Sequence, residues 1–146
     1  MSEREELTRR MDAIVDTYHG GTATVDQLII LRRDLASVSY RVAAFVKEVY
    51  GQAGLTYIRR KYRIAESILD ARNQEAKAPA MNILEQKAMT IRSVQIAQEE
   101  EVWAEAEKEA LKSKLDFVKQ VLSSMQQEIA YEANEKKNAH FQGTGR

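Results

Sequence analysis

The stretch LIILRRDLASVSYRVAAFVKEV, residues 28–49, decides the fold class of this chain. Its apolar side chains recur at alternating intervals of three and four residues, at Leu28, Leu31, Leu35, Val38, Val42, Phe45 and Val49. This spacing lines them along one side of an α-helix and matches the heptad pattern of helices that pack on other helices. Either Thr22 or Thr24 offers an N-cap, so the pattern predicts a helix that begins near residue 24.

Two glycines interrupt this pattern before it resumes. Gly51 and Gly54 follow the quoted stretch, and the apolar spacing then continues at Leu55, Ile58, Tyr62, Ala65 and Leu69. A glycine in a helix interior costs about 1 kcal/mol relative to alanine. The sequence therefore predicts one long helix over 24–74 with a kink or a close helix approach near the glycines, and a complete break there is the alternative.

The rest of the chain also reads as helix. A short helix is predicted over 3–19, ended by Gly20, and a second long helix over 80–137, beginning near Pro79 because proline is tolerated in a first turn. Residues 139–146 have no periodicity and are expected to form a flexible tail. The prediction is an all-α, coiled-coil-like domain over 1–138 whose two long helices form an antiparallel hairpin. Each would bury only one apolar stripe, so we expect a homo-oligomer.

Composition excludes several functional classes. The 146 residues include no Cys, which removes disulfides and thiolate chemistry. No apolar run approaches the ~20 residues that span a bilayer, and the charged N-terminus does not match a signal peptide. We expect no membrane association and a cytoplasmic location. Nucleotide-binding glycine motifs are absent, and Asp16-x-x-His19 is the sole approximation to a metal-binding pair. The sequence predicts no enzyme activity, no cofactor and no metal.

The formal net charge of zero conceals a strong separation of charge along the chain. Residues 28–63 carry eight cations and two carboxylates, whereas residues 65–110 carry five cations and ten carboxylates. Such a separation creates a local field that attracts an anionic ligand. The same separation is expected if the basic segment pairs with the acidic one, within a chain or between subunits.

The cations concentrate in YIRRKYR, residues 57–63. If Leu55, Ile58, Tyr62 and Ala65 face the core, the remaining faces of the helix display Tyr57 and the cations Arg59, Arg60, Lys61 and Arg63. Exposed cations follow a phosphate backbone, and an exposed aromatic ring stacks on unpaired bases. The alternative is that these cations are solvated or paired with the acidic residues of 99–109. Tyr62 is expected in the core, and Trp103 is expected to anchor a neighbouring helix or subunit.

Several segments together resemble the bacteriophage recombination mediator proteins. The basic, tyrosine-containing YIRRKYRIAESILDARNQ (57–74) is followed by the linker EAKAPA (75–80). A charged helix then leads through Trp103 into LDFVKQVLSSMQQEI (115–129), similar to the family's C-terminal helix. ALKSKLDF (110–117) also looks like the family's basic DNA-binding segment. The likeness extends over about residues 55–135.

The resemblance implies a non-enzymatic, ring-forming oligomer that binds single-stranded DNA and contacts a recombinase or single-strand-binding protein. Residue by residue, it points to Lys112 and Lys114 as further DNA contacts. The C-terminal apolar stripe is expected to hold helices or subunits together through Leu111, Leu115, Val118, Leu122 and Ile129. The other functional class that the sequence leaves open is a coiled-coil structural or adaptor protein that binds a protein partner and no nucleic acid.

Overall fold

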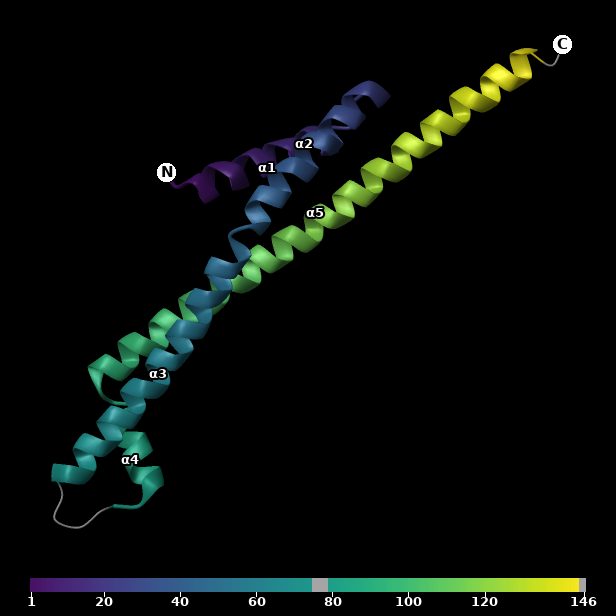
Figure 1. Cartoon of the computed structure of the whole chain (residues 1–146). Helices are drawn as coiled ribbons and strands as arrows, with labels where there is room; N and C mark the ends of the chain where they lie inside the picture. Colours follow the sequence, from purple (N-terminus) through teal and green to yellow (C-terminus); the bar gives the residue numbers. More distant parts are fainter. Residues whose placement is uncertain (75–78, 145–146) are drawn as a thin grey trace. The chain divides into compact units, whose positions relative to one another are not determined.

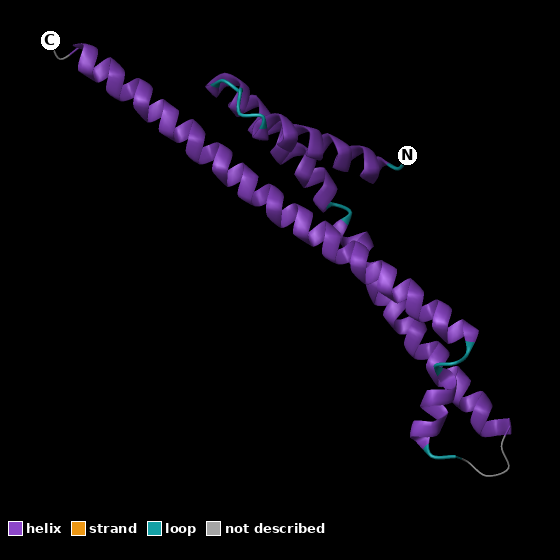
Figure 2. Cartoon of the chain, turned by 180° about the vertical axis from the view of Figure 1, so that it is seen from behind, coloured by secondary structure: helices purple, strands orange, loops and turns teal. Residues whose placement is uncertain are grey.

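The computed structural model describes residues 1–74 and 79–144, and every regular element within these ranges is an α-helix (Figure 2). The all-α prediction is therefore confirmed. Figure 1 labels the helices in chain order. They are α1 (Glu3–His19), α2 (Val25–Ala43), α3 (Val46–Gln74), α4 (Met81–Ala88) and α5 (Arg92–Thr144).

The chain divides into two compact units, where the sequence predicted a single domain. Unit 1 consists of Met1–Phe45 and Lys112–Arg146, and unit 2 consists of Val46–Leu111. Unit 1 contains α1, α2 and the C-terminal part of α5, and unit 2 contains α3, α4 and the N-terminal part of α5. The basic segment 57–63 and the acidic segment 99–109 thus belong to the same unit.

The helices of unit 1 begin at side-chain caps. Ser2 caps α1 in a capping box with Glu5, and Thr24 caps α2 in a capping box with Gln27. In each box the hydroxyl accepts a backbone N–H that the helix leaves unpaired. Of the two threonines that the sequence offered, Thr24 is the cap. The core of unit 1 is built from Leu7, Met11, Val15, Leu28, Leu35, Val38, Val42, Val118, Val121 and Met125.

Two polar contacts fasten α5 to α1 in unit 1. The hydroxyl of Tyr18 donates a hydrogen bond to Glu128 Oε2 at 3.0 Å, and Lys114 Nζ lies 2.9 Å from Asp12 Oδ2. Burial, together with the carboxylate of Glu128, raises the pKa of Tyr18 above its usual value. The tyrosine therefore stays neutral and keeps donating this bond as the pH rises toward 10.

The first long helix of the prediction is two helices, and its break is not at the glycines. The helix α3 continues through Gly51 and Gly54, whereas the chain leaves α2 at Ala44 and Phe45. There the N–H of Phe45 bonds to the carbonyl of Val42, a spacing of three residues typical of a tightened turn. The predicted boundaries at 24 and 74 are correct to within a residue, but the kink near the glycines is replaced by a turn upstream.

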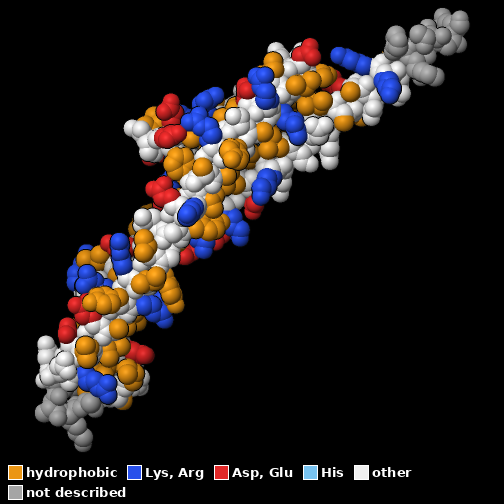
Figure 3. Space-filling view, in the orientation of Figure 1, with side chains coloured by type: hydrophobic (Ala, Val, Ile, Leu, Met, Phe, Trp, Pro, Cys, Tyr) orange, Lys and Arg blue, Asp and Glu red, His pale blue; other side chains and the backbone are white. Residues whose placement is uncertain are grey.

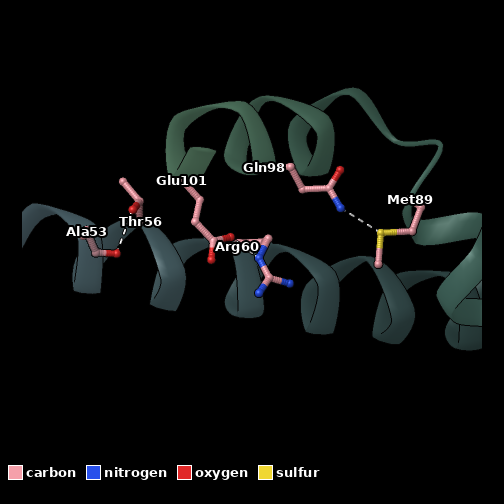
Figure 4. Close-up of polar contacts among 6 residues, drawn as sticks. All are labelled: Ala53, Thr56, Arg60, Met89, Gln98 and Glu101. Atoms are coloured by element: carbon pink, nitrogen blue, oxygen red, sulfur yellow. Dashed lines mark hydrogen bonds and ion pairs between the residues drawn. The ribbon is translucent and has the colours of Figure 1, made fainter. Parts of the chain in front are cut away.

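The second long helix is also divided. A short turn at Met89–Ile91 separates α4 from α5, and Gln98 Nε2 donates to Met89 Sδ at 3.0 Å across it. Figure 4 shows this contact beside the α3 backbone. Helix α5 continues to Thr144, so residues 139–144, predicted as a flexible tail, extend the helix instead. Residues 145–146 of that tail lie outside the described residues.

Candidate nucleic-acid interface

Tyr57 lies close to two cations of its own helix, α3. The guanidinium carbon of Arg60 lies 5.4 Å from the centroid of the Tyr57 ring, and Lys61 Nζ lies 5.6 Å from it. Both distances are within the range at which a cation is attracted to an aromatic face. The Tyr57 ring itself is exposed. These three residues therefore combine positive charge with an accessible aromatic surface, as the sequence predicted.

Arg60 turns inward rather than outward. Its Nε donates to Glu101 Oε2 on α5, and only 23% of the Arg60 side chain and 18% of the Glu101 side chain are exposed. Figure 4 shows the two side chains meeting between the helices of unit 2. The Glu101 carboxylate offsets the charge of this guanidinium, and the burial of both side chains limits the access of a phosphate. The expectation that all four cations of YIRRKYR face solvent is wrong for Arg60.

The other three cations remain on the surface of unit 2. Arg59, Lys61 and Arg63 are all exposed. Arg63 pairs with Glu66 one turn away, at 3.1 Å, but both side chains face water, where such a pair contributes less than about 1 kcal/mol. These three cations therefore stay accessible to an anionic partner. Figure 3 shows Lys and Arg side chains beside hydrophobic ones in the part of the molecule that contains α3.

The apolar stripe of α3 faces solvent instead of a core. The predicted core residues Ile58 and Tyr62 are 62% and 63% exposed, and Leu55, Ala65 and Leu69 are exposed as well. The covered side of α3 is the opposite one, which carries Val49, Ala53, Thr56, Arg60 and Ser67. The prediction that the heptad residues of this helix fill the core of the chain is wrong.

The covered side of α3 carries small and partly polar residues, so hydrophobic periodicity does not reveal it. The buried Thr56 hydroxyl donates to the carbonyl of Ala53 at 2.8 Å, so its burial leaves no unpaired group (Figure 4). Small side chains allow two helix backbones to approach closely. The signal was present as Ala53, Thr56 and Ser67 at helical spacing, but a stripe of larger apolar residues on the other side outweighed it.

A groove of about 580 Å³ lies beside this exposed stripe, between α3 and the first turns of α5. Ile58, Tyr62 and Ile96 give it an apolar surface, and Arg59 and Arg63 supply cations. The remaining lining residues are Ser93, Ala97 and Glu100. The groove thus brings together two guanidinium groups and an aromatic ring, with one carboxylate that opposes the binding of an anion.

A second cation–aromatic contact joins α3 to α5 further along unit 2. Lys108 Nζ lies 5.2 Å from the centroid of the Tyr50 ring. The cation that the acidic segment contributes therefore contacts α3, just as Glu101 of the same segment contacts Arg60. Both contacts tie the acidic segment 99–109 to α3 within one chain.

The two lysines suggested by the family resemblance differ in their surroundings. Lys112 is exposed, whereas Lys114 is engaged by Asp12 of α1. Both belong to unit 1, and the cations of 57–63 belong to unit 2. Lys112 is therefore the more accessible of the two to a phosphate.

The residues predicted to hold subunits together are mostly covered in a single chain. Leu111 and Val118 are buried, and Leu115, Leu122 and Ile129 are half-buried. Trp103 is the exception, with 76% of its surface exposed. Of this set, Trp103 is the residue most available to a partner.

The described residues were also compared with the requirements of a membrane-spanning helix and of a metal site. None of the helices in residues 1–74 and 79–144 is both long and apolar enough to cross a membrane. Over the same residues, no three His, Asp or Glu side chains gather in a way that would hold a metal ion.

Comparisons with known proteins do not assign the chain to a family. No family model matches it, and neither the curated proteins nor the solved structures contain a match. The resemblance to bacteriophage recombination mediators therefore remains a prediction that rests on the segments quoted above.

Proposed function

We propose that this protein is a non-enzymatic, homo-oligomeric single-stranded-DNA-binding protein that assists recombination or replication in a bacteriophage-infected cell. One observation carries the proposal. The exposed ring of Tyr57 lies next to the exposed cation Lys61, on a helix that also exposes Arg59 and Arg63. Single-stranded nucleic acid is bound by this combination of aromatic stacking surface and cations.

Each group has a distinct part in this proposal. Arg59, Lys61 and Arg63 neutralise phosphates, and Tyr57 stacks on an unpaired base. Lys112 adds a secondary phosphate contact from unit 1. The family resemblance supports a recombinase or a single-strand-binding protein as the protein partner, and a cytoplasmic location.

Binding is tested by fluorescence anisotropy with a labelled oligonucleotide of ~30 nucleotides at two salt concentrations, about 50 and 300 mM. Neutralising several phosphates releases counterions, so affinity falls steeply between these salt concentrations. Absence of binding at the lower salt would contradict the proposal.

The site is tested by replacing Arg59, Lys61 and Arg63 together with Ala. We expect weaker binding to every DNA sequence and a salt dependence that is smaller by about three phosphate contacts. Arg60 is left in place because its loss would strand Glu101 in the helix interface. The matched control replaces three other exposed cations, Arg9, Arg10 and Lys47, with Ala. Equal losses in both triple variants would show that net charge, and not this site, determines binding.

A second candidate function is a structural or adaptor protein that binds no nucleic acid. It is favoured by the ion pairs that hold two of the predicted phosphate contacts, Arg60 with Glu101 and Lys114 with Asp12. In this candidate the separated charges serve helix packing. The DNA titration distinguishes the two, because an adaptor gives no anisotropy change at either salt concentration.

We further propose that α3 and α5 pack in antiparallel fashion within unit 2, as the hairpin prediction requires. The order of their contacts supports this direction. Tyr50 meets Lys108, and Arg60, further along α3, meets Glu101, earlier in α5. As the residue number rises along α3, the number of the contacted residue in α5 falls. This relation is expected of antiparallel neighbours.

A further inference from the structure

The exposed stripe of α3 has the spacing of a helix-pairing surface. Gly51, Leu55, Ile58, Tyr62, Ala65 and Leu69 are separated by four, three, four, three and four residues. These intervals are the a and d positions of a heptad, whose side chains pack into a second helix. The opposite side of α3 is the one covered in the chain, so this pairing surface, the α3 seam, has no partner among the described residues.

The charges that flank the α3 seam are self-complementary. On one flank, next to Ile58 and Ala65, lie the exposed residues Arg59 and Glu66, at consecutive e positions. On the other flank lie Lys61 and the half-buried Ile68, at consecutive g positions. Side chains at e and g form ion pairs across a coiled coil and select its partner. A second copy of α3 presents the opposite charge to Arg59 and to Glu66 without any change of sequence.

We propose that α3 pairs with α3 of a second copy of this chain in antiparallel register. Tyr62 of one copy lies against Ala65 of the other, and Ile58 lies against Leu69. In the same register Arg59 of each copy faces Glu66 of the other. The second helix passes along the groove that Ile58 and Tyr62 line with Ile96. The proposal rests on the proposed homo-oligomer and does not require the proposed DNA binding.

Volume, rather than charge, sets the antiparallel direction. A parallel pair would also form ion pairs, between Lys61 and Glu66, so the charges fit both directions. A parallel pair, however, stacks Tyr62 on Tyr62 and Ala65 on Ala65, which crowds one layer and leaves the next one empty. The antiparallel pair places a large side chain against a small one in both central layers, as close packing requires.

The direction is tested by disulfide cross-linking, which is unambiguous because the natural chain has no Cys. The variants Ile58→Cys and Leu69→Cys are prepared separately and oxidised alone or after mixing. The antiparallel register predicts a disulfide-linked dimer in the mixture only. Two Ile58→Cys copies would hold their thiols ~16 Å apart, since 11 residues separate positions 58 and 69, which is too far for a disulfide. Cross-linking of Ile58→Cys alone would overturn the antiparallel register.

The flanking charges are tested with two variants of identical chemistry. Arg59→Glu places two carboxylates together on the proposed interface, whereas Lys61→Glu changes the other flank, which faces Ile68. By sedimentation velocity without DNA, Arg59→Glu is expected to weaken self-association about tenfold or more, and Lys61→Glu to weaken it much less. Adding Glu66→Arg to Arg59→Glu restores the opposite charges and is expected to restore association.

The outcomes distinguish the proposed α3 pairing from the proposed homo-oligomer and from the proposed DNA binding. A natural chain that sediments as a monomer would overturn both the homo-oligomer and the α3 pairing. An oligomer that tolerates Arg59→Glu and gives no cross-link in the mixture would overturn the pairing and leave the homo-oligomer. Arg59 belongs to both proposals, so both association tests are run without DNA. Loss of DNA binding in the variant that replaces Arg59, Lys61 and Arg63 supports the DNA site only if that variant still self-associates.

Discussion

At the scale of single residues, the ion pair between Arg60 and Glu101 links the two oppositely charged segments of the sequence. A partly buried pair contributes little net stability compared with apolar side chains, but removing one partner strands a charge. The cations of YIRRKYR are thus not equivalent. Arg60 bridges α3 and α5 within unit 2, and Arg59, Lys61 and Arg63 are exposed at the surface.

Replacing Arg60 with Met should lower the free energy of unfolding by about 1–3 kcal/mol, because Glu101 is left half-buried without its partner. Urea unfolding followed by circular dichroism measures the change. The double variant Arg60→Met with Glu101→Leu is expected to recover most of the loss, and Lys61→Ala, at an exposed position, should change stability by less than about 0.5 kcal/mol. A double variant as unstable as Arg60→Met would contradict this account.

Part of the candidate site could be predicted at this scale. The exposure of Tyr57, Arg59, Lys61 and Arg63 follows from the composition of the segment, because dense charge is rarely buried. The inward turn of Arg60 depends on a carboxylate 41 residues away in the sequence. The sequence showed an acidic segment that could supply that carboxylate. It did not show which cation of YIRRKYR would pair with it.

At the scale of the helix, the observed helix ends do not coincide with the helix-breaking residues of the sequence. The chain leaves α2 at Ala44 and interrupts α4 and α5 at Met89, although neither place has a Gly or Pro. Conversely, α3 contains two glycines without interruption, at positions where a Cβ would meet nothing within 4 Å. Helix-breaking residues are therefore a weak guide here, since their cost of about 1 kcal/mol is smaller than the packing of a whole helix.

The cap of α2 gives a test in which neighbouring threonines serve as variant and control. Thr24→Ala removes the hydroxyl that accepts the N–H of Gln27, and should cost about 1 kcal/mol of unfolding free energy. Thr22→Ala removes the same atoms two residues upstream, outside the cap, and should cost less than about 0.5 kcal/mol. Thermal and urea unfolding measure both variants. The hypothesis fails if the two substitutions are equally costly.

The direction of the α3 side chains is also a helix-scale result. Heptad spacing identified Leu55, Ile58 and Tyr62 as members of one continuous apolar stripe, and the structure places this stripe in solvent. It did not reveal that the rest of the chain covers the opposite side. Periodicity shows that a face is apolar, but it does not show whether another helix of the chain covers that face.

At the scale of the whole molecule, the helical class was predictable and the division into units was not. A chain with one Pro and continuous three-and-four spacing leaves no alternative to helices. The division follows from contacts between residues far apart in sequence, since unit 1 joins Met1–Phe45 to Lys112–Arg146. Such long-range contacts have no periodic signature.

The uncovered α3 seam predicts that stability depends on protein concentration. If association covers the seam, raising the concentration about a hundredfold stabilises the folded form by mass action, and the thermal midpoint should rise by a few °C. Calorimetry at low and high concentration measures the shift. The shift should be smaller in the Arg59→Glu variant, and a midpoint that stays constant for the natural chain would contradict self-association.

The two sides of α3 have a consequence for how this protein tolerates mutation. Its inner side carries the small, buried residues Ala53, Thr56 and Ser67. Its outer side carries large residues that are exposed to water, including Ile58 and Tyr62. In a saturation mutagenesis library, enlarging substitutions on the inner side should deplete the folded protein itself. Polar substitutions on the outer side should leave its yield unchanged, or improve it, and deplete only the assembled form. The tolerated substitutions in α3 would then follow two separate patterns. Residues on the inner side would be restricted by folding, and residues on the outer side would be restricted by assembly.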